Sequence, residues 1–148
     1  MLIHLSRRAR HKSQQRGTAT IEFALLGMVL VTLMLGASEF GRAMLQYNTL
    51  VKAVRSAARY ASNYADSATV RTAAQNLVVY GKATAGASGS EAVPGLKVAN
   101  VSVTYATQDA LSNKVAVTVS GLTFQPLASW LLPSFTFGTI TAVMTQAK

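Results

Sequence analysis

The chain has 148 residues, with 14 Lys and Arg against five Asp and Glu. This length allows one small domain beside a membrane segment, and because the chain has no cysteine, disulfides and thiolate metal sites are excluded. The basic excess is uneven, since five of the 14 bases and no acid precede Gly17. We interpret residues 1–17 as a basic leader. No Phe, Tyr or Trp accompanies these bases to stack on a nucleic acid, so we expect no nucleic-acid partner.

Residues 18–38 are predicted to cross a membrane as a helix. Residues 23–38 carry no charge, and a helix over residues 18–38 with a rise of ~1.5 Å per residue spans ~31 Å, about the thickness of the hydrocarbon layer. A basic segment before an apolar helix stays in the cytoplasm, so we expect the C-terminal part across the membrane. The alternative is a secretory signal cut after residues 36–38. It is less favoured because Glu22 opens the apolar stretch and the helical pattern continues beyond it.

Glu22 is the one charged residue within this predicted span. A carboxylate at membrane depth costs about 2.5–3.5 kcal/mol on insertion scales, so it indicates a function and calls for a cationic partner. The alternative is a carboxylate that reaches the membrane surface from the end of an uncut anchor.

Residues 39–80 are predicted to be an extracytoplasmic helical region. Apolar residues recur every three or four positions between Phe40 and Ala65, so the first helix should continue past the membrane with one apolar face. Alanines four residues apart would let another helix approach closely, although alanine is also simply a good helix former. Ser67 or the preceding aspartate should cap a second helix that ends at Gly81. The residues expected to pack are Phe40, Gly41, Tyr47, Ala53, Ala57 and Ala61.

The rest of the chain predicts a flexible loop and a small sheet. Residues 81–95 are rich in Gly, Ala and Ser, which is typical of a loop. Apolar and polar residues alternate within residues 96–148, as they do in strands. The fold class is therefore α+β, with a long N-terminal transmembrane and amphipathic helix, a second short helix and an antiparallel sheet of about three strands.

Three segments are expected to be the strands of this sheet. Residues 101–105 and 115–119 predict a hairpin with its turn at residues 108–113, and residues 135–145 predict a last strand. Residues 126–133 are too few to cross a membrane, and we expect a helical turn that covers the sheet with Trp130 as its anchor.

The histidines and acids are too scattered for catalysis or metal binding. His4 and His11 lie in the leader, whereas Asp66, Glu91 and Asp109 follow the predicted span. A histidine base therefore cannot meet an orienting acid in one place. No metal-ligand spacing and no phosphate-binding glycine pattern is present in the sequence. We expect no enzyme activity, and no catalytic residue, metal or cofactor.

The junction between leader and span resembles a type IV prepilin signal of the Tad (tight adherence, Flp pilus) branch. In that signal a membrane aspartic peptidase cuts after a glycine that is followed by four residues and Glu-Tyr. Here Gly17 precedes four residues and Glu22, and Phe23 stands where tyrosine is usual. The resemblance implies cleavage between Gly17 and Thr18, and a role for Glu22 and Phe23 in recognition and assembly.

A narrower resemblance is to the TadE-like family. It rests on residues 16–25, on the sequence Glu39-Phe40-Gly41-Arg42 and on the alanine-rich residues 53–61. The major Flp pilin is much shorter, so a chain with a separate sheet region is more similar to the minor pseudopilins of that system.

This resemblance implies a pilin-like fold and a minor pilin or pseudopilin that serves Tad pilus assembly and secretion, with adhesion as the downstream effect. The chain would be a single-pass protein of the bacterial inner membrane, with its N-terminus cytoplasmic, its C-terminal region periplasmic and a place in the pilus as an option. The implied partners are the lipid bilayer, a prepilin peptidase, other pilins and pseudopilins, and the Tad inner-membrane assembly machinery. The alternative is an unprocessed single-pass anchor for an envelope domain that binds a secretion partner.

Overall fold

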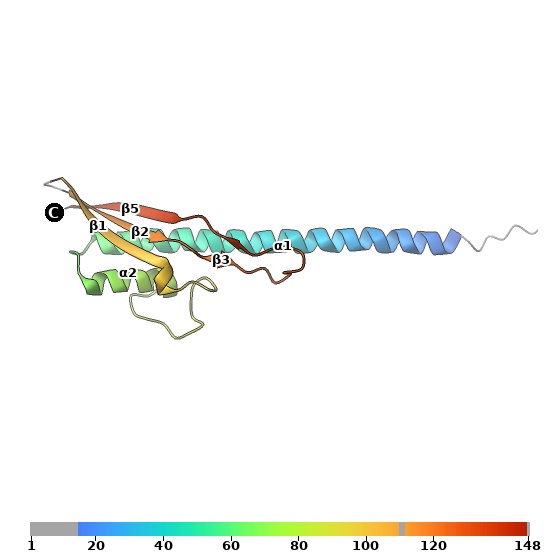
Figure 1. Cartoon of the computed structure of the whole chain (residues 1–148), viewed down its shortest axis with the longest axis horizontal. Helices are drawn as coiled ribbons and strands as arrows, with labels where there is room; N and C mark the ends of the chain where they lie inside the picture. Colours follow the sequence, from blue (N-terminus) through green and yellow to red (C-terminus); the bar gives the residue numbers. More distant parts are fainter. Residues whose placement is uncertain (1–14, 110–111, 148) are drawn as a thin grey trace, which may run out of the picture.

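One helix, α1 (Gln15–Ser62), extends along most of the length of the described structure (Figure 1). The computed structural model describes residues 15–109 and 112–147, so most of the predicted leader lies outside the described residues. With 48 residues and a rise of ~1.5 Å each, α1 is ~72 Å long. Large apolar side chains on its N-terminal half are exposed around the helix. Within the described residues, α1 is the one helix long and apolar enough to cross a membrane.

The C-terminal half of α1 carries the rest of the chain. Its buried face packs against a second helix and a sheet. Alanines on this face keep the helices close, because a methyl group leaves room for the neighbouring backbone. The fully or almost fully buried residues of α1 are Leu50, Val54, Ala57, Ala58 and Ala61.

The second helix, α2 (Ala68–Tyr80), lies beside the C-terminal half of α1 (Figure 1). The Ser67 side chain accepts a hydrogen bond from the Val70 N–H and so caps the helix, as predicted. Gly81 ends the helix in the left-handed conformation, with φ 69°, and its N–H donates to the Leu77 carbonyl. Asp66 pairs instead with Arg71.

The main sheet has three antiparallel strands, β1 (Val101–Asp109), β2 (Ser112–Val119) and β5 (Ile140–Ala147), in the order β1-β2-β5. A 3-10 turn, η1 (Val98–Asn100), leads into β1. The alternation predicted for β1 and β2 is present, since the valines of one face are buried in the core. Both strands extend further into the predicted turn than expected, and residues 110–111 lie outside the described residues.

The predicted last strand is interrupted in the structure. Two short strands, β3 (Thr123–Phe124) and β4 (Phe135–Thr136), pair with each other in a separate ribbon. The Phe137 N–H then donates to the Leu122 carbonyl, and β5 starts only at Ile140. The prediction of one strand over residues 135–145 was therefore wrong. The physical reason is that the aromatic side chains of residues 135 and 137 pack with Phe124, which holds this part of the chain in the ribbon with β3.

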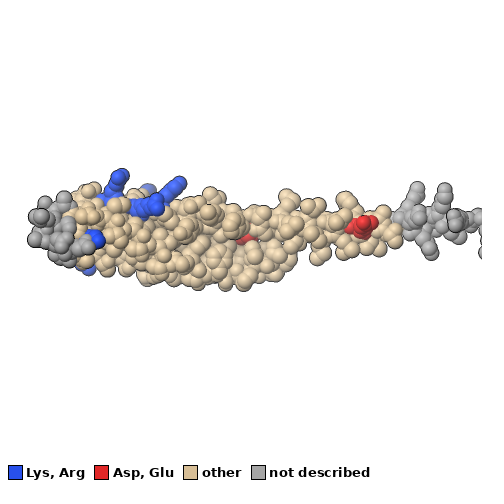
Figure 2. Space-filling model, turned by 90° about the horizontal axis from the view of Figure 1, so that it is seen from above, with Lys and Arg blue, Asp and Glu red and all other residues tan. Residues whose placement is uncertain are grey.

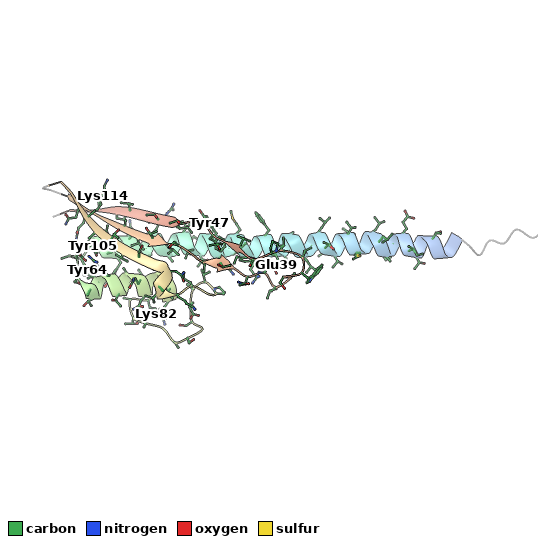
Figure 3. All side chains as sticks on the ribbon, in the orientation of Figure 1. Glu39, Tyr47, Tyr64, Lys82, Tyr105 and Lys114 are labelled. Carbon is green, nitrogen blue, oxygen red and sulfur yellow. The ribbon has the colours of Figure 1, made fainter. Side chains whose placement is uncertain are left out.

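The segment between β3 and β4 also differs from the prediction. The N–H groups of Leu131 and Leu132 both donate to the Ala128 carbonyl, so a turn does form. However, Trp130 is 74% exposed and does not anchor the turn on the sheet. The segment instead lies beside α1, where hydrogen bonds described below hold its backbone (Figure 3).

We expect Phe124→Ala to lower the free energy of unfolding by about 3–5 kcal/mol, the usual cost of truncating a buried phenylalanine. Phe124 is 2% exposed and contacts the rings of Phe135 and Phe137 at centroid distances of 5.2 and 6.2 Å. Denaturant unfolding of the full chain in detergent, followed by circular dichroism, measures the change. Phe40→Ala is the matched control, because Phe40 is 73% exposed on α1. Equal losses in the two variants would contradict the assignment of Phe124 to the packed interior.

Candidate functional site

The predicted cleavage site lies in the first turns of α1. Gly17 and Thr18 are both helical, so the peptide bond between them belongs to a regular helix in the described structure. A Cβ atom built on Gly17 meets no atom within 4 Å. The fold of this chain therefore has room for a side chain at residue 17.

Glu22 and Phe23 follow one turn later on the same open part of α1. Both are exposed, and Glu22 is four residues from Thr18, which places the two on the same side of the helix. Glu22 is the one charged residue among residues 18–38, and Figure 2 shows the narrow part of the molecule covered almost entirely by uncharged residues. The arrangement offers an anionic group about one helical turn from the predicted new N-terminus.

The residues expected to pack lie in two different environments. Ala57 and Ala61 are fully buried against α2 and the sheet, and Ala53 is partly buried against the same core. This face of α1 is consequently occupied by the chain itself. By contrast, Phe40 is exposed, and a Cβ atom on Gly41 meets nothing within 4 Å. Tyr47 is also part-exposed, and its ring lies 6.2 Å from that of Phe137.

Glu39 and Arg42, three residues apart on α1, form an ion pair. Arg42 donates to Glu39 Oε2 at 2.7 and 3.2 Å. The structure adds two contacts to the distant segment between β3 and β4. The Leu127 N–H donates to Glu39 Oε1 at 3.0 Å, and Arg42 also donates to the Gln125 carbonyl at 2.8 Å. Glu39 is consequently only 6% exposed.

The Glu39–Arg42 pair thus ties two parts of the chain that are more than 80 residues apart. The Arg42 guanidinium also lies 4.8 Å from the centre of the Phe124 ring, which adds a cation–π contact. The hydrogen-bonding groups that the segment supplies to this pair, the Gln125 carbonyl and the Leu127 N–H, belong to the backbone. Backbone groups leave no signature in the sequence, so no pattern identifies this connection in advance.

Hydrogen bonds from Arg42 are the largest influence on Glu39 and lower its pKa from the ordinary value of 4.5. Removal of water works in the opposite direction, and the N–H of Leu127 contributes to the lowering. Because the pKa is lower in the folded state, the Glu39 carboxylate stabilises the fold above pH 4.5, and this contribution disappears as the pH falls through the folded-state pKa.

We therefore expect the difference in thermal stability between the wild-type chain and Glu39→Gln to be largest near pH 7 and to narrow steadily below pH 4.5. Melting of both chains across this pH range measures it. The Asp66–Arg71 pair, in which hydrogen bonds from Arg71 lower the pKa of Asp66, titrates in both chains and cancels. A difference that stayed constant with pH would show that the Glu39 charge does not hold the contact.

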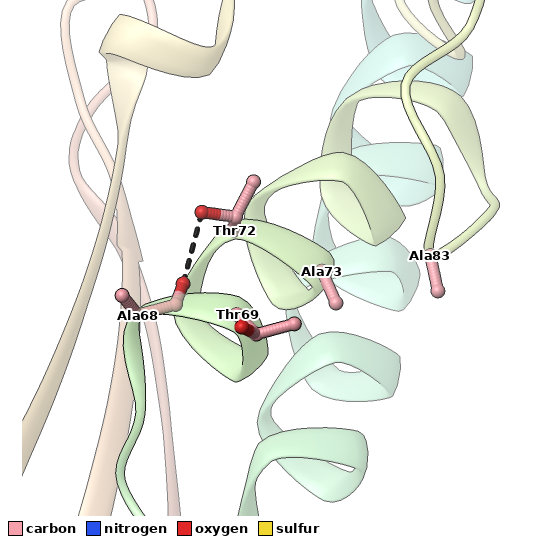
Figure 4. A pocket seen from close by; sticks show the side chains of 5 residues that line it. All are labelled: Ala68, Thr69, Thr72, Ala73 and Ala83. Carbon is pink, nitrogen blue, oxygen red and sulfur yellow. Dashed lines mark hydrogen bonds between the residues drawn. The ribbon is translucent and has the colours of Figure 1, made fainter.

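The described residues hold no cluster of the side chains that usually bind a metal ion. No three His, Cys, Asp or Glu side chains among them lie together. A hollow beside α2 is lined by Ala68, Thr69, Thr72, Ala73 and Ala83 (Figure 4). Its Thr72 hydroxyl donates to the Ala68 carbonyl of the same helix at 2.9 Å, and no titratable side chain lines it.

The basic side chains of the described structure gather over the body and not over the bare part of α1 (Figure 2). Lys52, Arg55 and Arg59 are exposed and follow helical spacing on the side of α1 that the core leaves open. The N-terminal half of α1 is therefore suited to an apolar environment, whereas the opposite end is suited to water.

The fold and the site define an α+β protein with one N-terminal helix fit to be a single-pass membrane anchor. Residues 17–59 match the model of the TadE-like protein family, which confirms the resemblance predicted from the sequence. The matched residues all lie in α1, so α2 and both sheets are outside the match. Searches of curated proteins and of solved structures found no match.

Proposed function

We propose that this chain is a minor pilin or pseudopilin of a Tad pilus, processed after Gly17 by a prepilin peptidase. The observation that carries the proposal is the junction of Gly17, Glu22 and Phe23 at the start of a bare apolar helix, within the residues that match the TadE-like family. Its partners are then the bilayer, the peptidase, other pilins and pseudopilins, and the Tad inner-membrane machinery. The N-terminus of the precursor is cytoplasmic, and the body is periplasmic.

This proposal divides the chain by function. Residues 1–17 are the leader that is removed, and residues 18–38 hold the precursor in the inner membrane. Residues 39–80 and 96–148 form the periplasmic body, joined by the loop of residues 81–95. The bare half of α1 is available to lipid before assembly and to the helices of other subunits afterwards.

Electrostatics gives Glu22 a role in such an assembly. Cleavage creates an ammonium group on Thr18 inside the membrane, where an unpaired cation is costly. A carboxylate at ~4 Å attracts it by about 4 kcal/mol at an effective dielectric constant of ~20, before desolvation is subtracted. The Glu22 carboxylate supplies this charge either within the chain or to a neighbouring subunit. Pairing between subunits would also fix their axial register.

The N-terminal sequence and intact mass of the protein purified from its native membrane test the proposal. Under the proposal, the mature chain starts at Thr18. A chain that starts at Met1 would support the unprocessed anchor that binds a secretion partner. A start near Glu39 would instead indicate an ordinary secretory signal. Each outcome is a distinct mass, so one measurement separates the three.

A further inference from the structure

A second apolar surface lies next to the predicted membrane span. The sequence has no charged residue between Lys114 and Lys148. Within this stretch, residues 125–134 connect β3 to β4 and are called here the 125–134 loop. Leu127 is 83% exposed and Trp130 is 74% exposed, although burial from water is favourable for side chains of this size. The 125–134 loop therefore presents large apolar groups with no protein cover.

The structure fixes this loop at one level along α1. Glu39, which binds the Leu127 N–H, directly follows the predicted span of residues 18–38. From there the loop extends along α1 toward its bare half (Figure 1), and the Glu39 label in Figure 3 marks where the two meet. Phe40, 73% exposed, adds a further apolar group at the same level of the helix. A membrane that surrounds residues 18–38 would consequently reach the loop.

The composition of the loop suits the membrane interface. Tryptophan is enriched there because its ring is apolar and its N–H is polar. The charges of Glu39 and Arg42 face each other and the loop backbone, so they are already paired where the loop meets the helix. The apolar surface also adjoins the bare half of α1, which the proposed function places in lipid before assembly, so lipid is the occupant that fits the unassembled chain.

We infer that the 125–134 loop enters the headgroup region of the periplasmic leaflet, with Trp130 as its interfacial anchor. The inference rests on the proposed role of α1 as a membrane anchor. The protein then contacts the bilayer at two places, the helix and the loop. These two contacts would fix the tilt of the body and its distance from the membrane. The Glu39–Arg42 pair sets the depth of the loop.

Trp130 is the only tryptophan in the chain, so its fluorescence reports this loop alone. The test uses the full chain, one copy per nanodisc of phosphatidylethanolamine and phosphatidylglycerol, with no bromine, with bromine on the acyl chains near the headgroup, or with bromine deep in the acyl chains. We expect Trp130 to emit at a shorter wavelength than in denaturant, to lose emission to the brominated lipids and to be weakly quenched by acrylamide.

Two variants with a single tryptophan at another position calibrate the result. Both carry Trp130→Phe, which should not disturb packing because residue 130 is exposed. Leu30→Trp places the probe in the middle of the predicted span and should be quenched by the brominated lipids. Tyr64→Trp places it at the far end of the body, where Tyr64 is 49% exposed, and should be quenched by acrylamide only.

These probes separate failure of the inference from failure of the proposed anchor. If the probe at residue 30 is quenched by lipid and Trp130 is not, the loop does not enter the membrane although α1 does. If neither is quenched, α1 is not in the bilayer and the proposed anchor fails as well. Trp130 shielded from acrylamide but untouched by brominated lipid would mean that protein covers it, which also overturns the inference.

Discussion

Gly17→Val is expected to leave the leader attached to all of the protein. A peptidase that requires glycine before the cleaved bond has no space there for a branched side chain, so the precursor should accumulate in the membrane. The fold gives no competing explanation, because a Cβ atom at residue 17 meets nothing within 4 Å. Intact mass of the purified chain measures the change as a retained segment of residues 1–17.

Gly27→Val is the matched control for this variant. Gly27 lies in the same helix, ten residues further on, and a Cβ atom there also meets nothing within 4 Å. Both substitutions therefore have the same local cost in α1, and only the one at residue 17 should stop processing. Normal processing of Gly17→Val would remove the basis for the prepilin proposal.

Glu22→Ala is expected to spare processing and to prevent assembly into the pilus system. Without the carboxylate, the ammonium group of a mature chain that starts at Thr18 has no anionic partner from residue 22. Each 1.4 kcal/mol lost between subunits lowers association about tenfold, so the loss of even part of the pairing should be visible. The amount of the chain in sheared pili, or cross-linked to other pilins, measures assembly, and its level in the membrane provides the reference.

Glu22→Gln distinguishes charge from shape. Glutamine keeps the size and the hydrogen-bonding oxygen but removes the charge, so it should fail as alanine does. Glu22→Asp retains the charge on a shorter side chain and should recover part of the assembly. Wild-type assembly by Glu22→Ala would refute the argument that this carboxylate sets the register of subunits.

Local patterns in the sequence predict much of this fold. The three- and four-residue spacing of apolar side chains predicts the continuation of α1, and Ser67 and Gly81 mark the ends of α2 where the structure has them. The alternating valines of β1 and β2 predict a hairpin. These features were predictable because each depends on neighbours in the chain, through capping, turn chemistry or the period of one element.

The parts that were not predictable depend on distant residues. Phe135 and Phe137 alternate as in a strand, but their rings pack with Phe124 and divert the chain from the sheet. The position of Trp130 follows from hydrogen bonds between the Glu39–Arg42 pair and backbone groups of the 125–134 loop. Periodicity carries no information about such contacts, so a turn packed on the sheet was the expectation.

In the candidate site, too, some features were predictable from the sequence and others depend on distant contacts. Sequence alone marks Gly17 and Glu22, because a glycine and a carboxylate are conspicuous beside an apolar stretch. The structure adds that Ala57 and Ala61 are already covered within the chain, whereas Phe40 and Gly41 are open. An alanine ladder cannot by itself reveal whether its partner helix belongs to the same chain or to another one.

Because α1 is continuous, the rotation of the body about the helix axis is fixed relative to the membrane segment. The helix contains no proline and is unbroken from Gln15 to Ser62, so one residue inserted after Glu39 would turn the body by about 100° and displace it by ~1.5 Å. A seven-residue insertion would change the rotation by only about 20°. If subunits pair through Glu22 as proposed, the continuous helix would also fix which side of the sheet faces the neighbouring subunit.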